Sequence, residues 1–289
     1  MKISIITPSY NQGKFIERTL KSVAIQTGSE IEHVVIDGGS TDNTVEILKN
    51  FNPSLRWVSE KDKGQTDAVN KGIRQTNGDI IGWLNSDDIY YPGTITRVID
   101  FFQQNPDVDV VYGMADHIDV EDNPFEEYPT EPWNFDRLKE TCFICQPALF
   151  FRRRIIAAHG LPNIALQYCM DYEYWLRLGK RGVRFEYLPE KLAGSRLYAE
   201  NKTLGARVKV HLEINKMLKK MFGRVPEKWL FNYAHVVMED RLRGPERSAW
   251  IVLEVGMRSL MAALRWNRKV SANMANIVHQ WVKSAFSRK

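Results

Sequence analysis

One stretch constrains the fold of this chain more than any other: residues 78–88, which read GDIIGWLNSDD. Its apolar residues lie between a Gly-Asp turn and a polar turn, which is the pattern of a buried strand. The strand ends in the adjacent carboxylates Asp87 and Asp88. Ligands bind at the carboxyl ends of strands in open α/β sheets, and Mg²⁺ or Mn²⁺ prefers oxygen ligands. The pair therefore predicts a ligand or metal site, whereas an isolated pair would more often be a solvated turn.

Strand-like and helix-like patterns alternate on either side of this stretch. Apolar, β-rich runs cover residues 3–7, 31–36, 55–59, 80–84 and 108–112, and helical periodicity covers 16–24, 45–51, 65–75 and 95–102. Short connections between such elements imply right-handed crossovers and a mostly parallel sheet. We therefore expect an α/β fold in which the ends of several strands meet at one edge.

Polar loops follow the first two expected strands. The loop from Pro8 to Gly13 contains Tyr10 and Asn11 but neither a dinucleotide fingerprint nor a P-loop, so its aromatic ring is a candidate for stacking on a base. Asp37 ends the second strand beside two glycines. It either shapes that turn or accepts a hydrogen bond from a base or ribose. The expected helix 65–75 carries Asp67 and Lys71 and is more polar than packing requires, so part of it is expected to face a ligand.

Composition favours a folded soluble protein. The 289 residues are 44% hydrophobic and 26% charged, and the net charge of +5 is too small to indicate a nucleic-acid partner. The three cysteines form no disulfide framework and are expected to be buried thiols in a reducing compartment. The amino-terminal residues lack a signal-peptide core, and no run of about 18 residues is free of charge. We expect the chain in the cytoplasm.

Regular alternation stops after residue 112. Residues 116–134 are acidic and contain three prolines, which predicts a surface excursion or lid. Residues 146–151 are expected to form a strand. Arg152, Arg153 and Arg154 follow it, either as a phosphate contact or, more often for such a run, as a solvated face.

Four motifs together resemble the family 2 glycosyltransferases of bacterial type, which have the GT-A fold. They are TPSYNQ, VIDGGSTDNT, GQTDAVNKGI and GDIIGWLNSDD, and their order over roughly residues 1–205 makes the combination specific. The resemblance implies a catalytic domain, 1–205, with a nucleotide-sugar-binding half, 1–115, and an acceptor half, 116–205. A helical extension, 206–289, would follow.

The resemblance also implies roles for individual residues. Tyr10 and Asp37 would hold the nucleotide, Asp87 would face the ribose or the donor sugar, and Asp88 would bind Mn²⁺ or Mg²⁺ bridged to the diphosphate. Arg196 and Lys202 are candidates for the diphosphate itself. The complete set of donor-binding candidates is Pro8, Tyr10, Asn11, Asp37, Asp67, Lys71, Asp87 and Arg196.

The catalytic candidate is Asp171, at the start of DYEYWLRL. An acid at the start of a helix often serves as a cap. In the family, however, the acidic residue in this context is the general base, and Glu173 is the neighbour most easily confused with it. Tyr198 stands near the position of the family's usual histidine, which leaves a metal contact from that segment in doubt.

The resemblance implies an inverting transfer of a sugar from a nucleoside-diphosphate donor, with UDP-sugar as the default, to a hydroxyl of a glycan or lipid-linked acceptor. Cell-surface polysaccharide synthesis is the expected setting. Two alternatives share the sheet and the acid pair: a non-catalytic nucleotide-sugar-binding module and a nucleotidyltransferase. A nucleic-acid binder is disfavoured because an acid-lined edge repels phosphate in the absence of a metal.

The carboxyl-terminal stretch 241–289 is basic, and residues 250–264 and 270–282 show helical apolar spacing. Two basic amphipathic helices are expected. They would either lie on an anionic membrane surface, at the inner face of the cell membrane, or pack on the catalytic domain or on a second subunit in a homodimer.

Overall fold

The structure is a computed structural model that describes residues 1–28, 30–201, 205–242 and 249–287. Lys202 therefore lies outside the described residues. The chain divides into two compact units. The first, here called the sheet unit, comprises residues 1–135 and 142–198, and the second, the helical unit, comprises 136–141 and 199–289. The boundary expected at residue 205 stays a prediction.

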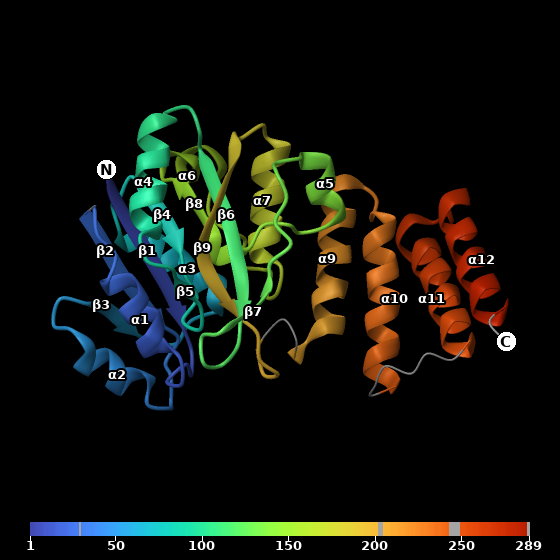
Figure 1. The fold of residues 1–289 in the computed structure, drawn as a ribbon, viewed down its shortest axis with the longest axis horizontal. Helices are drawn as coiled ribbons and strands as arrows, with labels where there is room; N and C mark the ends of the chain where they lie inside the picture. Colours follow the sequence, from blue (N-terminus) through green and yellow to red (C-terminus); the bar gives the residue numbers. More distant parts are fainter. Residues whose placement is uncertain (29, 202–204, 243–248, 288–289) are drawn as a thin grey trace. The chain divides into compact units, whose positions relative to one another are not determined.

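One half of the central sheet is parallel (Figure 1). Its strands run in the order β3-β2-β1-β4. Their bounds are β1 Lys2–Ser9, β2 Glu30–Asp37, β3 Arg56–Ser59 and β4 Ile80–Trp83. The register pairs Ser9 with Asp37 and Asp37 with Ser59, so the carboxyl ends of three strands meet at one edge.

The other half of the sheet mixes directions. The order continues through β8, β6, β9 and β5, with β7 paired to β6. Strand β8 is antiparallel to both β4 and β6, whereas β6 and β9 are parallel. The bounds are β5 Ile89–Tyr90, β6 Val110–Ile118, β7 Pro124–Glu127, β8 Leu149–Arg152 and β9 Phe185–Arg196. The mostly parallel character thus belongs to the half that precedes the acid pair.

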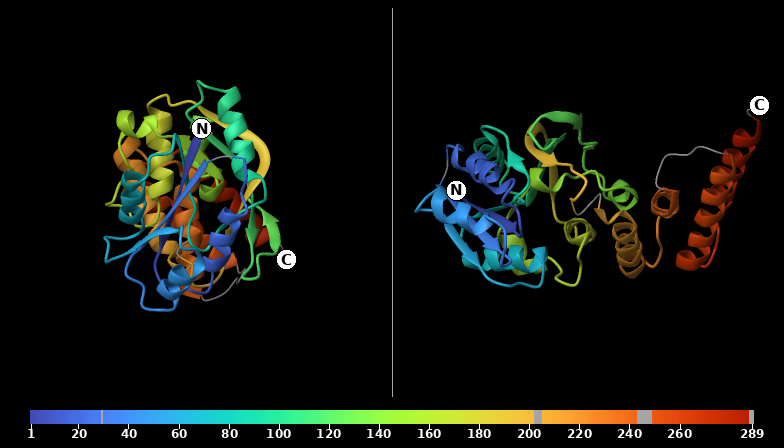
Figure 2. Two further views of the ribbon diagram at one scale, coloured as in Figure 1. Left: turned by 90° about the vertical axis from the view of Figure 1, so that its left-hand side faces the viewer. Right: turned by 90° about the horizontal axis from the view of Figure 1, so that it is seen from below.

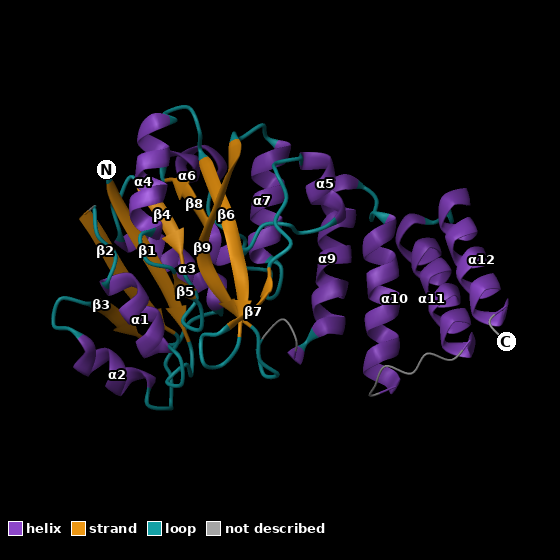
Figure 3. Ribbon diagram, in the orientation of Figure 1, coloured by secondary structure: helices purple, strands orange, loops and turns teal. Residues whose placement is uncertain are grey.

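Helices cover both faces of the sheet (Figure 3). On one face, Val23 and the apolar side of α4 pack against Ile3 and Ile5 of β1. On the other, α3 approaches so closely that a Cβ on Gly72 would lie 2.4 Å from Cγ2 of Ile6. The helix bounds are α1 Ile16–Ala24, α2 Thr44–Phe51, α3 Gln65–Gln75, α4 Thr94–Gln104, α6 Arg154–His159 and α7 Met170–Lys180.

The helical unit contains the long helices at the carboxyl-terminal end. They are α9 Arg207–Phe222, α10 Glu227–Leu242, α11 Ala249–Asn267 and α12 Ala272–Ser287, and each packs on the next. The short helix α5, Phe135–Glu140, contributes the Lys139 carbonyl, which accepts a hydrogen bond from Trp229 Nε1. Among the described residues, no helix combines the length and apolarity needed to cross a bilayer.

Two expectations change in detail. The excursion 116–134 begins as ordered sheet, because β6 continues to Ile118 and β7 returns along it as a hairpin. The strand expected at 146–151 starts later, since residues 146–148 form one 3₁₀ turn, η1 Gln146–Ala148, before β8.

The arginine triplet is neither a phosphate site nor simply a solvated face. Arg152 donates to the carbonyls of Val108 and Phe102 at 2.7 Å each. Arg154 is exposed and pairs with Asp109 at 2.7 Å. Arg152, like Arg153 described below, therefore fastens β8 to neighbouring backbone, because arginine presents several donors in a fixed geometry.

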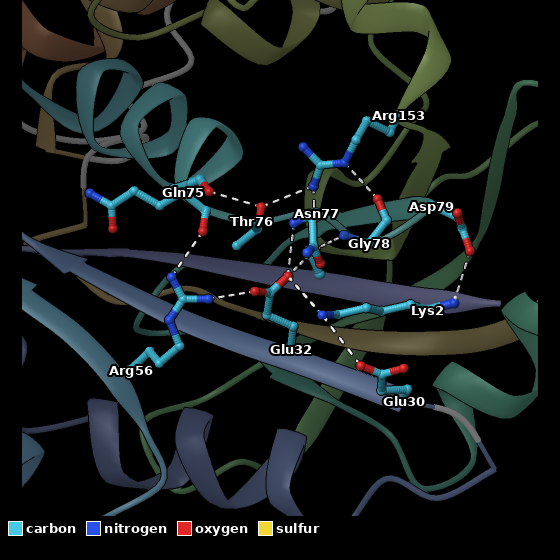
Figure 4. Close-up of polar contacts among 12 residues, drawn as sticks. Lys2, Glu30, Glu32, Arg56, Gln75, Thr76, Asn77, Gly78, Asp79 and Arg153 are labelled. Atoms are coloured by element: carbon cyan, nitrogen blue, oxygen red, sulfur yellow. Dashed lines mark hydrogen bonds and ion pairs between the residues drawn. The ribbon is translucent and has the colours of Figure 1, made fainter.

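Arg153 belongs to a polar network at the amino ends of the parallel strands (Figure 4). Its guanidinium donates to the carbonyls of Gly78 and Ile73 at 2.6 and 2.8 Å and to the hydroxyl of Thr76 at 2.9 Å. Glu32 accepts from the backbone N–H of Asn77 and from Arg56 in the same network. Opposite charges are therefore paired at this end of the sheet.

We predict that Arg153→Ala lowers the free energy of unfolding by about 2–4 kcal/mol, because it leaves several carbonyls without donors. Arg154→Ala is the matched control and should cost less than about 1 kcal/mol, since its ion pair is exposed. Urea unfolding measures both values. Equal losses for the two variants would contradict the structural role of Arg153.

Candidate functional site

The acid pair lies immediately beyond β4, at the edge where the parallel strands end. Asp88 is 4% exposed, and its Oδ1 accepts a hydrogen bond of 2.9 Å from the backbone N–H of Arg196. Asp87 accepts a hydrogen bond of 3.0 Å from the hydroxyl of Tyr198. Two adjacent carboxylates are thus held in place by the segment that ends β9.

Burial makes ionisation of the pair unfavourable. The pKa of Asp88 is raised by loss of solvent first and by the neighbouring charge of Asp87 second. The pKa of Asp87 is raised by burial too, although the Tyr198 hydroxyl and the positive charge of Arg196 oppose the shift. A positive ion near the pair would relieve both penalties.

Asn85 organises the loop that carries the acids. Its Oδ1 accepts from Trp83 Nε1 at 2.9 Å and from Gln65 Nε2 at 2.7 Å. Its Nδ2 donates to Asp88 at 3.1 Å and to Gln146 at 2.9 Å. The sequence analysis passed over Asn85 and Gln146. The asparagine's place within LNSDD was the available signal, whereas no pattern points to Gln146.

Arg196, a candidate for binding the diphosphate, contacts protein groups in this structure. Its side chain is fully buried and donates to the Asp87 carbonyl at 2.7 Å and to the Asp119 carbonyl at 2.5 Å. It also pairs with Asp122, in the turn between β6 and β7, and lies over the Phe15 ring. The structure therefore commits Arg196 to protein groups, where it ties the hairpin to the acid-pair loop.

The donor-side candidates from β1 and β2 lie next to one another. Asp37 is fully buried, and its carboxylate accepts from the N–H groups of Gly39 and Ser40 and from the Ser59 hydroxyl. Asn11 Oδ1 accepts from the backbone N–H of Thr41 at 2.8 Å. Asp37 thus shapes the turn after β2, and Asn11 joins that turn to the loop after β1.

Tyr10 and Pro8 differ in exposure. The Tyr10 side chain is 60% exposed at the end of β1, where a ring can stack on a planar ligand. Pro8 is buried within the strand and pairs in register with Ile36. Tyr10 therefore presents a contact surface, while Pro8 contributes to the sheet.

The polar face of α3 is used largely by protein contacts. Lys71 pairs with Glu60 at 2.7 Å and lies 3.8 Å from Asp67, and the hydrogen bond that Lys71 donates to Glu60 raises the pKa of Lys71. Asn70 donates to the Pro162 carbonyl at 3.0 Å, so the loop before α7 lies against this helix. Asp67 and Lys71 are close to each other but are already part of an ion-pair cluster.

Asp171 lies in the first turn of α7 and is partly exposed. Its Oδ1 accepts from the backbone N–H of Tyr172 at 2.7 Å. Burial raises the pKa of the Cys145 thiol, and both Asp88 and Asp171 are close enough to raise it further. Asp171 and Asp88 thus both lie near one buried thiol.

Glu173, the alternative to Asp171, is occupied elsewhere. It is 7% exposed and pairs with Arg177 at 3.0 Å. Arg177 in turn donates to the His159 carbonyl at 2.6 Å. Glu173 therefore helps, through Arg177, to anchor α7 to the end of α6.

A divalent cation fits the chemistry of the acid pair. Adjacent carboxylates supply the hard oxygen ligands that Mg²⁺ and Mn²⁺ prefer, and a cation would offset their raised pKa values. Within the described part of the chain, no group of three His, Cys, Asp or Glu side chains is placed to hold a metal. Further ligands would have to come from a bound phosphate or from water, as is usual for Mg²⁺.

A sequence-family comparison identifies the chain. The family model described as "Glycosyl transferase family 2" matches residues 4–160, which is more than half of the 289 residues. The chain belongs to glycosyl transferase family 2. The matched part includes the acid pair and the donor-side candidates up to Lys71, whereas Asp171, Arg196 and Tyr198 lie beyond it.

Curated relatives agree with this family. The chain is 29% identical over 205 residues to a chondroitin synthase of Escherichia coli. The aligned region covers 70% of this chain and 30% of that protein. It is 32% identical over 179 residues to a PGL/p-HBAD biosynthesis glycosyltransferase of Mycobacterium bovis, covering 60% of this chain and 68% of the relative. The chain thus spans about a third of the length of the chondroitin synthase.

Solved structures show that the fold is GT-A. TarS residues 1–349 of S. aureus, in complex with UDP-GlcNAc, align over 99% of this chain and 88% of that one, with a TM-score of 0.63 and 18% identity. The mannosyltransferase PcManGT of Pyrobaculum calidifontis, in complex with GDP-Man and Mn²⁺, aligns over 99% and 81%, with a TM-score of 0.61 and 18% identity. The expected fold class is confirmed.

Because the pKa of Asp88 is raised in the folded state, ionisation of Asp88 is expected to destabilise the fold as pH rises. Between the unfolded pKa, near 4, and the raised folded pKa, the folded state binds more protons, so stability falls as pH rises, by up to about 1.4 kcal/mol per unit. We predict that Asp88→Asn, measured by urea unfolding with chelator, gains stability relative to the parent as pH rises from 5 to 8.

Asp42→Asn is the control of opposite sign. Burial alone would raise the pKa of Asp42, but hydrogen bonds from Thr44 and Gly13 lower it overall. That carboxylate therefore stabilises the fold above its unfolded pKa, and the contribution is lost as pH falls. Asp42→Asn should be less stable than the parent across the neutral range. An Asp88→Asn difference that does not change with pH would contradict the unfavourable burial of the pair.

Proposed function

We propose that this chain transfers a sugar from a nucleoside-diphosphate donor, UDP-sugar by default, to a hydroxyl, with inversion at the anomeric carbon. The observation that carries the proposal is the acid pair of half-buried Asp87 and buried Asp88 at the edge where β1, β2 and β4 end. The relatives support a transferase, and TarS and PcManGT have been solved with UDP-GlcNAc and GDP-Man. Inversion rests on the resemblance to the family.

For the donor, we propose that Tyr10 stacks on the base, since its ring is exposed beside the loop that contains Asn11. Asp37 would act on the nucleotide mainly through the turn it shapes. Pro8, Asp67 and Lys71 line this side in the proposal, and Arg196 acts by holding the acid-pair loop rather than by contacting phosphate.

For the cation, we propose that Asp88 holds Mn²⁺ or Mg²⁺ and that Asp87 faces the ribose or donor sugar. A bound divalent cation supplies charge neutralisation for the departing diphosphate. Asn85 and the backbone of Arg196 orient the Asp88 carboxylate through their hydrogen bonds. The Tyr198 hydroxyl orients Asp87 in the same way.

For the reaction, we propose Asp171 as the general base. It would take the proton of the acceptor hydroxyl while that oxygen forms its bond to the anomeric carbon and the bond to the diphosphate oxygen breaks. Glu173 is a poor rival because its carboxylate is buried against Arg177. The proton then resides on Asp171 until solvent removes it.

The acceptor is proposed to be a glycan or a lipid-linked sugar in cell-surface polysaccharide synthesis. In this proposal residues 1–115 bind the donor, residues 116–205 face the acceptor, and 206–289 form an extension. The enzyme would work in the cytoplasm or at the inner face of the cell membrane, as a monomer or a homodimer.

Asp171→Asn is predicted to reduce the rate of sugar transfer by about 10²- to 10⁴-fold, because the general base is lost. The Kd for the donor should change little. Glu173→Gln is the matched comparison and should act on the thermal midpoint rather than selectively on kcat, since its partner is Arg177. Transfer by Asp171→Asn at the parent rate would rule out the assignment of the base.

Nucleotide-sugars screened in the presence of Mn²⁺ should raise the thermal midpoint of the parent, because a ligand that binds the folded state stabilises it by mass action. The rise is predicted to disappear with chelator and in Asp88→Ala. If a donor stabilises the protein equally in all three cases, the metal is not part of the mechanism.

The reaction products separate the alternative functions. Release of pyrophosphate in place of glycosylated product would identify a nucleotidyltransferase, and binding without turnover would identify a binding module.

A further inference from the structure

The helical unit carries an apolar surface along one helix, which we call the α11 face: Trp250, Leu253, Met257, Met261 and Leu264. These residues follow one another at intervals of three and four, so they share one side of α11. Trp250 is 71% exposed, and Met257, Met261 and Leu264 are each at least 50% exposed. The face therefore presents large apolar side chains to solvent.

The α11 face is an open surface of one helix. Its apolar residues lie beside the charged pair Glu254 and Arg258, which belongs to the same surface. At one end, the ring of Trp250 meets that of Phe286 edge-on at a centroid distance of 5.8 Å, and Phe286 is itself 48% exposed. Helices α11 and α12 lie side by side there (Figure 2).

Cations border this face. Arg258 and Arg265 are seven residues apart, so they lie on the same flank of α11, and Arg268 and Lys269 are exposed directly after the helix. The acid on that flank, Glu254, is paired with Arg241 at 2.8 Å and with Arg258 at 2.7 Å. The border of the apolar face is therefore positive.

The charge of the chain is divided unevenly between its parts. Residues 199–289 contain 18 Lys and Arg against 7 Asp and Glu, a net charge of +11. Residues 1–198 contain 22 against 28, a net charge of −6. The excess of positive charge thus belongs to the part of the sequence that carries the α11 face.

We propose that the α11 face binds an anionic lipid surface, with α11 lying in the plane of the interface. An apolar stripe bordered by cations is the arrangement that buries side chains among acyl chains and leaves charges at the headgroups. A second copy is the less suitable occupant, because pairing this face with itself brings two strongly positive segments together. The inference does not depend on the transferase proposal and would stand if that failed.

The test is sedimentation of the full chain with phosphatidylcholine vesicles that contain phosphatidylglycerol, and with phosphatidylcholine vesicles alone. Binding is expected to the anionic vesicles. It should weaken as salt rises, because the Debye length falls from about 10 Å at 0.1 M to about 3 Å at 1 M. A full chain that ignores the anionic vesicles at low salt overturns the proposal.

An apolar variant tests the face itself. Replacing three exposed residues of the face by serine should weaken vesicle binding by about tenfold or more. Three equally exposed residues of the sheet unit provide the matched control, which should bind as the parent does. The face variant is Trp250→Ser, Met257→Ser and Met261→Ser, and the control is Ile25→Ser, Phe125→Ser and Ile164→Ser.

A charge variant tests the border. Removing each cation near the surface should cost about fivefold in affinity, so three reversals should cost about 100-fold or more. The border variant is Arg265→Glu, Arg268→Glu and Lys269→Glu, and the control in the sheet unit is Lys49→Glu, Arg74→Glu and Arg181→Glu. Thermal midpoints near that of the parent show that the variants are folded.

Two further results would decide against a lipid surface. One is vesicle binding by the apolar variant with the parent's affinity. The other is a parent dimer in sedimentation equilibrium that the apolar variant dissociates, since that result makes a second copy the occupant of the face. The supporting result is a blue shift of the tryptophan emission when anionic vesicles are added, and this shift should be absent in Trp250→Phe.

Discussion

The sheet unit depends on one unfavourable interaction, the burial of two adjacent carboxylates at the end of β4. Asp87 and Asp88 repel each other and lose solvent, and protein hydrogen bonds compensate for this only in part. The surrounding structure holds them there nonetheless. Asn85 fixes the loop from one side, and the Arg196 backbone fixes it from the other. Such an arrangement is stable in a folded protein only when the rest of the core supports it, and it favours a cation.

The two ends of the parallel strands contrast in their electrostatics. At the amino ends, Glu32 meets Lys2 and Arg56, and Arg153 satisfies several carbonyls. Opposite charges of the described residues there are paired with one another. At the carboxyl ends, like charges are brought together. Proteins concentrate local electrostatic conflict where they bind ligands, and this contrast is the physical reason to assign function to the acid edge.

The sequence predicted local features well because they depend on periodicity and turn chemistry. Helix α3 has the expected bounds, and the acid pair follows a buried strand. Contacts between distant segments could not be predicted in this way. The role of Arg196 depends on the pairing of β9 with β6 and on the hairpin turn at Asp122, which no local pattern encodes.

The same limit explains the other differences. The polarity of Lys71 led to the expectation that it faces a ligand, which stays a prediction. Its ion pair with Glu60 was not foreseeable, because it forms only when the loop after β3 folds back on α3. Arg152 and Arg153 belong to a charge run, and their roles depend on carbonyls in α3, in α4 and in the loops after these helices, far away in the sequence. Polarity indicates that a side chain needs a partner, and the tertiary fold determines whether that partner is a ligand or the protein.

The most direct test of the acid edge as the donor site is a crystal structure of the chain grown with UDP and Mn²⁺, with anomalous scattering used to locate the manganese. The account predicts one strong anomalous peak within coordinating distance of the Asp88 carboxylate and of the diphosphate, with the base beside Tyr10. Nucleotide bound elsewhere, or manganese away from the acid pair, would contradict it.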